Sequence, residues 1–355
     1  MTDRPGIMYI APPFMAGVAV AAATGSPSMV CVAATVLAAI CFVAACRSHG
    51  RTAAALVILF FALGALCHAT RGMIPFPRKE TASPVLGKLT AVIKSISFRH
   101  HETNALLLAL LTGQKEGLAR DTVSAFRAAG ASHILALSGL HLGIIYLIIS
   151  KLLAFLGNSR AAAALRSFII VALSAFYVFM TGASPSLVRA FLFITLSETA
   201  RHCPGRRKTP LSVWCTALMI QLLFRPEAIS SVGFQLSYLA MLGIFTLFPY
   251  LEGWYTPASG KAGKRDPLRL IWKSVALSVS CQVFTAPLVW FTFHTFPKYF
   301  LITNMTALPL TEGLMVCGIA TAALAAAGIS APLLTGLTDL LSVALIGSLG
   351  TIASM

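Results

Sequence analysis

Long apolar runs separated by short polar connections occupy most of this chain of 355 residues. A helix needs about 20 consecutive, mostly apolar residues to cross a hydrocarbon core about 30 Å thick. Runs that approach this length give eleven candidate spans: 8–24, 28–46, 52–70, 131–156, 162–181, 185–202, 210–224, 229–249, 270–293, 299–327 and 331–351. The pattern predicts an all-α fold, a polytopic membrane bundle with about eleven transmembrane helices.

Composition strengthens the membrane prediction. Hydrophobic residues make up 57% of the chain and charged residues only 11%. A soluble domain carries roughly 25% charged residues, so this chain has too few charges to cover a water-facing surface of its size. The eight cysteines form no C-x-x-C pair, and most of them lie inside apolar runs. They are typical of small buried hydrophobes, and we expect no metal and no other cofactor.

The remaining charge is strongly basic, with 27 Lys and Arg against 11 Asp and Glu. A basic surface is typical of nucleic-acid binding, but an excess of Lys and Arg in cytoplasmic loops also produces it. With the N-terminus in the cytoplasm, the short cytoplasmic connections hold these basic residues: Arg47, Arg51, Arg160, Arg166, Arg201, Arg206, Arg207, Lys208, Lys261, Lys264, Arg265, Arg269 and Lys273. The same orientation puts the C-terminus on the outer side.

The predicted outer segment 71–130 departs from this charge rule because it is also basic. Its candidate contacts for an incoming polyanion are Arg99, Lys115, Arg120 and Arg127. A solvated region that binds lipid headgroups is the alternative. Within it, the apolar run 105–111 is too short to span and is predicted to be interfacial or re-entrant, and 114–129 is predicted to form an amphipathic helix. This gives three parts: N-terminal transmembrane helices at 1–75, a basic amphipathic or re-entrant segment at 76–130, and a transmembrane channel domain at 131–355.

The segment 131–143 is the first candidate site. We expect Ser132 to cap a helix on which His133, Ser138 and His141 share one face. Gly139 and Gly143 form a G-x-x-x-G step for close helix packing. The polar groups either line a water-filled path or bond to neighbouring backbone in a packing helix.

A second site follows from Ser184 and Pro185, a hydroxyl and a proline that mark a helix start. Arg189 then lies about 7 Å into the helix, where its permanent charge needs a partner. Either a carboxylate such as Glu198 or Glu312 pairs with it, or it contacts a passing phosphate.

Other intramembrane polar positions are weaker candidates. Phe234 and Tyr238 stand four residues apart beside Gln235, and they form either stacking platforms for bases or a packing stripe. Prolines in predicted spans free backbone carbonyls, and Pro309 lies in the same predicted span as Asn304, a candidate for lining a cavity.

Motifs for catalysis are missing from the sequence. There is no P-loop, no metal-hydrolase spacing of His and Asp, and no G-x-S-x-G. A serine hydrolase using Ser138 and His141 is a minor alternative, because adjacent positions on one helix leave little room for a substrate carbonyl. We therefore expect a protein that is not an enzyme.

Four segments in order resemble the ComEC competence family, the membrane channel of bacterial natural transformation. They are 130–141, 182–190, 225–237 and the weaker set of Pro287, Asn304 and Pro309, and the resemblance covers about 98–330. It implies passage of single-stranded DNA through the bacterial cytoplasmic (inner) membrane, with a DNA receptor and a cytosolic helicase as partners. Fuller members carry an OB-like domain and a metallo-β-lactamase-like domain, and we expect a short form without them, either a reduced member that relies on partners or a truncated product.

The resulting hypothesis is a channel for single-stranded DNA in the lipid bilayer, with His133, Ser138, His141, Arg189, Phe234, Gln235, Tyr238 and Asn304 along the DNA path. A transporter of a small solute or lipid is the alternative. Whether the chain forms a homo-oligomer stays open.

Overall fold

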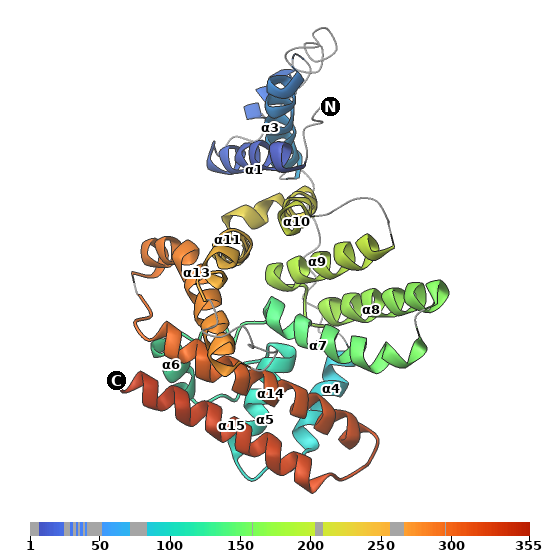
Figure 1. Cartoon of the computed structure of the whole chain (residues 1–355), viewed down its shortest axis with the longest axis vertical. Coiled ribbons are helices and arrows are strands. Elements are labelled where there is room, and N and C mark those ends of the chain that lie inside the picture. Colours follow the sequence, from blue (N-terminus) through green and yellow to red (C-terminus); the bar gives the residue numbers. More distant parts are fainter. Residues whose placement is uncertain are drawn as a thin grey trace. The chain divides into compact units, whose positions relative to one another are not determined.

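The computed structural model describes residues 7–24, 29–30, 33–34, 36–37, 40, 52–71, 84–157, 159–202, 209–255, 266–294 and 296–355. Most of the predicted span 28–46 lies outside these residues, as do Arg4, Arg47, Arg51, 206–208 and 261–265. Every regular element in the described part is a helix (Figure 1). The helices are α1 Ile7–Thr24, α3 Thr52–Arg71, α4 Pro84–Ser95, α5 His101–Thr112, α6 Arg120–Ala128, α7 Gly139–Leu152, η1 Leu153–Leu156, α8 Arg160–Met180, α9 Pro185–Arg201, α10 Pro210–Phe224, η2 Pro226–Ser230, α11 Val232–Thr246, α12 Phe248–Glu252, α13 Pro267–Phe293, α14 Phe300–Ala326 and α15 Pro332–Ala353.

Six helical segments among the described residues are long and apolar enough to cross a membrane: α1, α7 with η1, α8, α13, α14 and α15. Three shorter apolar helices accompany them: Leu56–Thr70 within α3, α10 and α11. The all-α polytopic membrane fold is thereby confirmed. The predicted span 185–202 becomes α9, which has 17 residues, carries Arg189, Glu198 and Arg201, and is not among the long apolar segments.

The chain forms two compact units, and each combines segments that are far apart in sequence. Unit 1 contains Met1–Lys79 and Leu192–Phe245, and unit 2 contains Glu80–Phe191 and Thr246–Met355. The predicted three-part division at 75 and 130 runs along the chain and stays a prediction.

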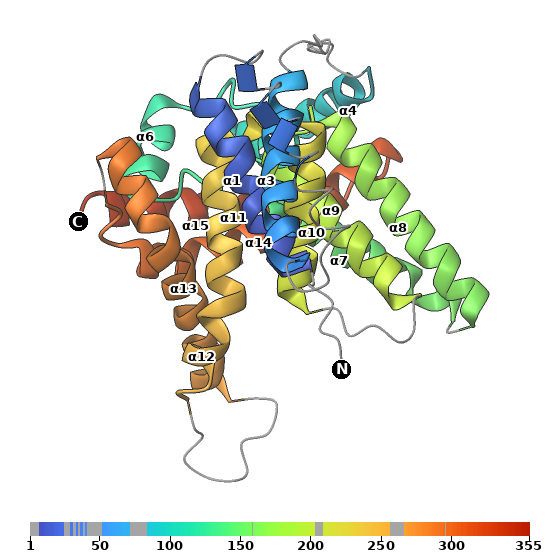
Figure 2. The same cartoon turned by 90° about the horizontal axis from the view of Figure 1, so that it is seen from above.

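In unit 1, α1 packs against α3 at unusually short range (Figure 2). A Cβ atom at Gly17 would collide with the carbonyl group of Phe61, and one at Gly64 with that of Phe14. Only hydrogen at these positions lets the two backbones approach so closely, a device common between membrane helices. α10 also contacts α1, and a small core forms around Phe14, Val18, Leu218, Leu222, Phe234 and Tyr238.

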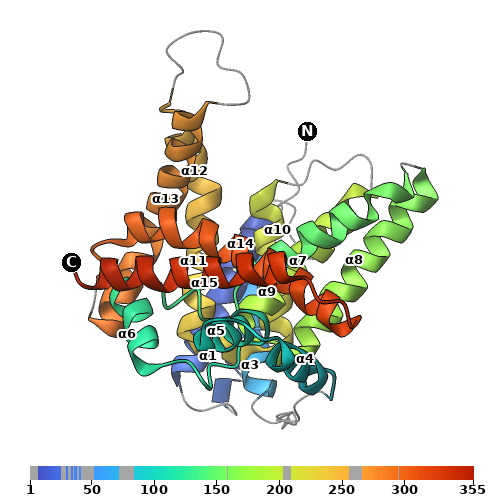
Figure 3. The ribbon, with the colours of Figure 1, turned by 90° about the horizontal axis from the view of Figure 1, so that it is seen from below.

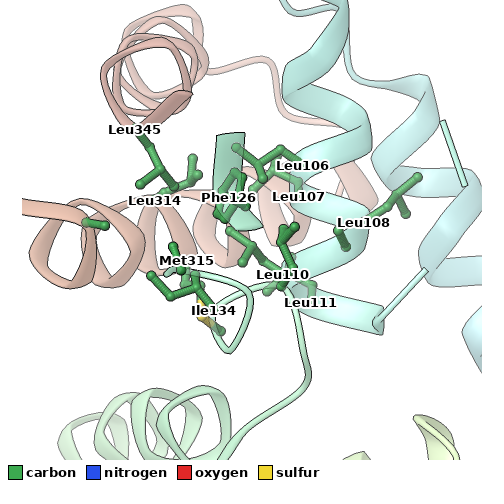
Figure 4. Close-up of a cluster of buried hydrophobic side chains, with 14 of the residues drawn as sticks. Leu106, Leu107, Leu108, Leu110, Leu111, Phe126, Ile134, Leu314, Met315 and Leu345 are labelled. Atoms are coloured by element: carbon green, nitrogen blue, oxygen red, sulfur yellow. The ribbon is translucent and has the colours of Figure 1, made fainter. Parts of the chain in front are cut away.

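Unit 2 is built around the short helix α5. Its residues 105–111 are all buried, and the surrounding cluster includes Phe126, Ile134, Leu314, Met315 and Leu345 (Figure 4). α14 and α15 lie side by side and both contact α5 (Figure 3). With 12 residues, α5 is about 18 Å long, so the prediction that this run does not span is supported.

The predicted helix 114–129 is wrong at its start, because α6 begins only at Arg120. Residues 113–119 form a loop in which Gly113 and Gly117 have φ of 81° and 99°. Glycine adopts this left-handed region at little cost, so the chain turns here before the helix begins.

Candidate functional site

The candidate segment 131–143 is helical only from Gly139 onward. Before it, the chain runs through turns in which Ile134 and Leu135 are buried. The hydroxyl of Thr303 donates to the carbonyl of Ala129 at 2.8 Å, and Gly130, with φ of 75°, has no room for a Cβ against Pro297. Packing against the start of α14 therefore holds this segment outside a helix.

This geometry corrects the predicted helix start. Ser132 is exposed in a turn and does not cap α7. His133 lies in the same turn, with Nδ1 3.1 Å from the carbonyl of Gly130, so it does not share a helical face with Ser138 and His141.

Ser138 and His141 together cap α7. The Ser138 hydroxyl accepts from the backbone N–H of Leu140 at 3.3 Å, and Nδ1 of His141 accepts from the backbone N–H of Ser138 at 3.2 Å. A ring nitrogen that accepts this bond carries no proton, so the hydrogen of the neutral imidazole is on Nε2. Nε2 is fully buried and has no hydrogen-bond partner among the described residues. This arrangement satisfies part of the unpaired N–H groups at the helix start, and the Nε2–H donor of His141 makes no hydrogen bond to the described residues.

Arg189 lies on α9 close to this capped helix end, and only 7% of it is exposed. A Cβ atom at position 139 would lie 3.4 Å from Nη2 of Arg189 and 3.5 Å from Cβ of Ala190. Gly139 therefore lies close to α9, as its packing role predicts. At Gly143, no atom of the described residues lies within 4 Å of the position that a Cβ would take. Close helix packing at Gly143 stays a prediction.

The predicted start of α9 is right. The helix begins at Pro185, and the hydroxyl of Ser184 accepts from the backbone N–H of Leu187 at 3.4 Å. Of the two carboxylates considered for Arg189, Glu198 also contacts Arg201 at 2.9 Å, and Glu312 is exposed on α14. The choice between a carboxylate partner and a passing phosphate for Arg189 stays open.

Phe234 and Tyr238 lie in the core of unit 1, with 3% and 4% of their surfaces exposed. Their ring centroids are 4.6 Å apart, and the Tyr238 hydroxyl donates to Gln221 at 2.9 Å. Trp214 donates from its ring to the carbonyl of Tyr238 at 3.1 Å. The described geometry is that of the packing alternative, and their contact with DNA stays a prediction.

Two members of this cluster, Gln221 and Trp214, were missed in the sequence. The sequence did contain a signal for this cluster. Gln221 lies inside the apolar run 210–224, and a buried amide needs a hydrogen-bond partner, so its presence indicates a polar contact within the core. Gln235, which was a candidate, donates from Nε2 to the carbonyl of Ile229 at 2.7 Å.

The remaining candidates lie on other elements of the chain. Asn304 is half-buried on α14. The four basic residues predicted to meet a polyanion, Arg99, Lys115, Arg120 and Arg127, are all exposed on unit 2. Within the described residues, no three His, Cys, Asp or Glu side chains are grouped to hold a metal ion.

Known proteins are similar to parts of this chain. ComE operon protein 3 of Bacillus subtilis (strain 168) is 24% identical over 208 residues, which cover 59% of this chain and 25% of that relative. Competence protein ComA of Neisseria gonorrhoeae is 32% identical over 143 residues, covering 38% of this chain and 20% of the relative. An uncharacterized protein of Aquifex aeolicus (strain VF5) is 31% identical over 189 residues, covering 52% and 40%.

This chain thus spans a quarter or less of the length of the two competence relatives. No solved structure matches it. The sequence profile of the Competence family, described as competence protein, matches residues 110–355. That match includes the capped start of α7, the helix α9 with Arg189, and all of α11 to α15, and the chain belongs to the Competence protein family.

Proposed function

We propose that this chain forms a passage for single-stranded DNA across the bacterial inner membrane during natural transformation. Family membership supports a role in competence and DNA uptake. The observation that carries the channel itself is Arg189, a guanidinium that is almost fully buried at the N-terminal end of α7. Arginine keeps its charge in proteins and binds phosphate oxygens in pairs, so it suits a narrow point through which phosphates pass.

The local electrostatics of this end favour an anion. The N-terminus of a helix carries partial positive charge, and α7 starts beside Arg189. Unit 2 also exposes four basic side chains that would raise the local concentration of a polyanion: Arg99, Lys115, Arg120 and Arg127. In this proposal the N-terminus is cytoplasmic and the C-terminus faces outward.

The passage is passive in this proposal, and the chain is not an enzyme. Force on the strand comes from a cytosolic helicase or a similar partner, and a DNA receptor delivers the substrate. The sequence offers no P-loop with which the chain could hydrolyse ATP.

The test is uptake of labelled duplex DNA into nuclease-protected cytosolic single strands. A strain lacking the gene is complemented with wild type, Arg189→Ala, or the control Arg160→Ala, which removes an exposed charge at the start of α8. We expect wild type and Arg160→Ala to restore uptake and Arg189→Ala to lower it at least tenfold with normal membrane insertion.

Two results would contradict the proposal. Full uptake with Arg189→Ala would remove the residue from the DNA path. Failure of a stably inserted wild-type chain to restore uptake, together with no binding of single-stranded DNA, would favour the transporter of a small solute or lipid.

A further inference from the structure

A small helical hairpin in unit 2 lies outside every site described so far. α12 lies beside the first turns of α13 (Figures 2 and 3). Three side-chain contacts join α12 and its following turn to α13. Lys273 forms an ion pair with Glu252 at 2.6 Å. The ring N–H of Trp272 donates to the carbonyl of Leu251 at 2.9 Å, and the Tyr255 hydroxyl donates to Asp266 at 2.9 Å. The hydrogen bond to Asp266 raises the pKa of Tyr255. The three contacts therefore hold α12 against the first turns of α13.

The hairpin holds two large aromatic rings open to the surroundings. Tyr250 is 66% exposed and Trp254 is 60% exposed. Their ring centroids are 5.6 Å apart at an interplanar angle of 70°, an edge-to-face pair. The contrast with Phe234 and Tyr238 is direct, because those rings are buried in a core.

The contacts between α12 and α13 place these rings beyond the apolar part of α13. Residues 274–293 contain no Asp, Glu, Lys or Arg, and their 20 residues span about 30 Å, the thickness of a hydrocarbon core. Arg269 and Lys273 precede this stretch, and Lys273 is bonded to Glu252, which lies between Tyr250 and Trp254 in sequence. The aromatic pair is therefore level with the charged turn of α13, where water and headgroups begin.

The charge of this region is complementary to a polyanion. Positions 250–273 contain five Lys and Arg residues against two acidic residues. Both acidic residues, Glu252 and Asp266, have partners within the hairpin, whereas Arg269 is exposed. Exposed aromatic rings beside cations are the combination with which proteins bind single-stranded nucleic acid without reading its sequence.

We propose that Tyr250 and Trp254 form a stacking site for the bases of single-stranded DNA, and that Arg269, exposed in the first turn of α13 in the same hairpin, contacts its phosphates. The inference rests on the proposed function, because it takes the transported strand as the ligand. A membrane-interface belt of Tyr and Trp is the other use of such rings, and it becomes an outcome of the test.

The experiment measures binding of a fluorescent 20-nucleotide oligo(dT) to the full chain in phosphatidylcholine nanodiscs by anisotropy. Trp254→Ala should weaken binding about tenfold, since stacking of one base on an aromatic ring is worth that much. The matched control is Trp290→Ala, which removes an exposed tryptophan from the charge-free part of α13 and should change the Kd less than twofold. Trp254→Phe keeps a ring and should retain most of the affinity.

The outcomes separate the two proposals. If wild type and Trp254→Ala bind equally, the stacking site is overturned and the channel proposal stands. If wild type binds no oligo(dT) at any salt concentration, both are overturned. The third outcome concerns the fluorescence of Trp254, identified as the tryptophan signal that Trp254→Ala removes. If brominated lipid quenches this fluorescence and oligo(dT) does not relieve the quenching, the rings belong to the membrane interface and the stacking site is overturned.

Discussion

The pair α1–α3 in unit 1 and the helix α5 in unit 2 are held by opposite means. Helices α1 and α3 pack closely because Gly17 and Gly64 have no side chains, which allows the two backbones to come into contact. Helix α5 relies on polar side chains at its ends. Asp339 of α15 accepts from the Thr103 hydroxyl at 2.6 Å and from Nδ1 of His100 at 2.7 Å.

At its other end, the Tyr177 hydroxyl of α8 donates to the carbonyl of Leu111 at 2.9 Å. A short helix buried in apolar surroundings has unsatisfied N–H groups at one end and C=O groups at the other. A carboxylate at the positive end and a hydroxyl at the negative end satisfy part of that need. The comparison teaches that full-length helices in this protein can pack through shape, whereas a half-length buried helix also needs partners for its ends.

The largest effect is expected from Asp339→Ala. It leaves the buried hydroxyl of Thr103 and the N-terminal end of α5 without their acceptor, so the free energy of unfolding should fall by about 3 kcal/mol. Thermal unfolding in detergent, followed by circular dichroism, measures it. Asp339→Asn is the control, because its amide oxygen still accepts one bond and should recover part of the loss. Equal stability of wild type and Asp339→Ala would show that α5 does not depend on this contact.

An intermediate effect is expected from Gly17→Ala. The added methyl group collides with backbone rather than with a flexible side chain, so α1 and α3 must separate, at a cost of about 2 kcal/mol. The same unfolding measurement applies. Gly143→Ala is the matched control, since its Cβ would meet no atom of the described part of the chain within 4 Å, and alanine there should change stability by less than about 1 kcal/mol. A larger loss at Gly143 than at Gly17 would contradict the close-packing account.

The smallest effect is expected from Tyr177→Phe. It removes one hydroxyl and leaves the ring, so the loss should be about 1 kcal/mol, the usual net value of one hydrogen bond. Tyr299→Phe serves as control, because that hydroxyl bonds to the carbonyl of Met355 in an exposed position. Hydrogen exchange at the amides that follow Leu111 should rise in Tyr177→Phe alone. Unchanged exchange there would mean that the carbonyl end of α5 needs no side-chain partner.

Much of the fold was readable from local sequence. The apolar runs of α1, α8, α13, α14 and α15 predict helices whose length matches a hydrocarbon core. Ser184 and Pro185 predict the start of α9, because a capping hydroxyl and a fixed proline φ act within one turn. The run 105–111 is too short to span by its length alone. The sequence predicts close helix packing at Gly139, but it does not predict that Arg189 is the neighbouring side chain.

Other features depend on residues that meet only in the folded chain. α7 starts at Gly139 because Thr303 and Pro297 of a distant segment hold Ala129 and Gly130 in a turn. Two aromatic residues four positions apart are buried at Phe234 and Tyr238 but exposed at Tyr250 and Trp254, because exposure depends on which helices pack alongside.

Asp339 finds its partners at 236 and 239 positions away in the chain. The sequence determined which segments are helical and apolar, because backbone hydrogen bonding and transfer from water act over a few residues. The tertiary structure decided which polar groups are satisfied, since a buried donor or acceptor requires a partner from another helix.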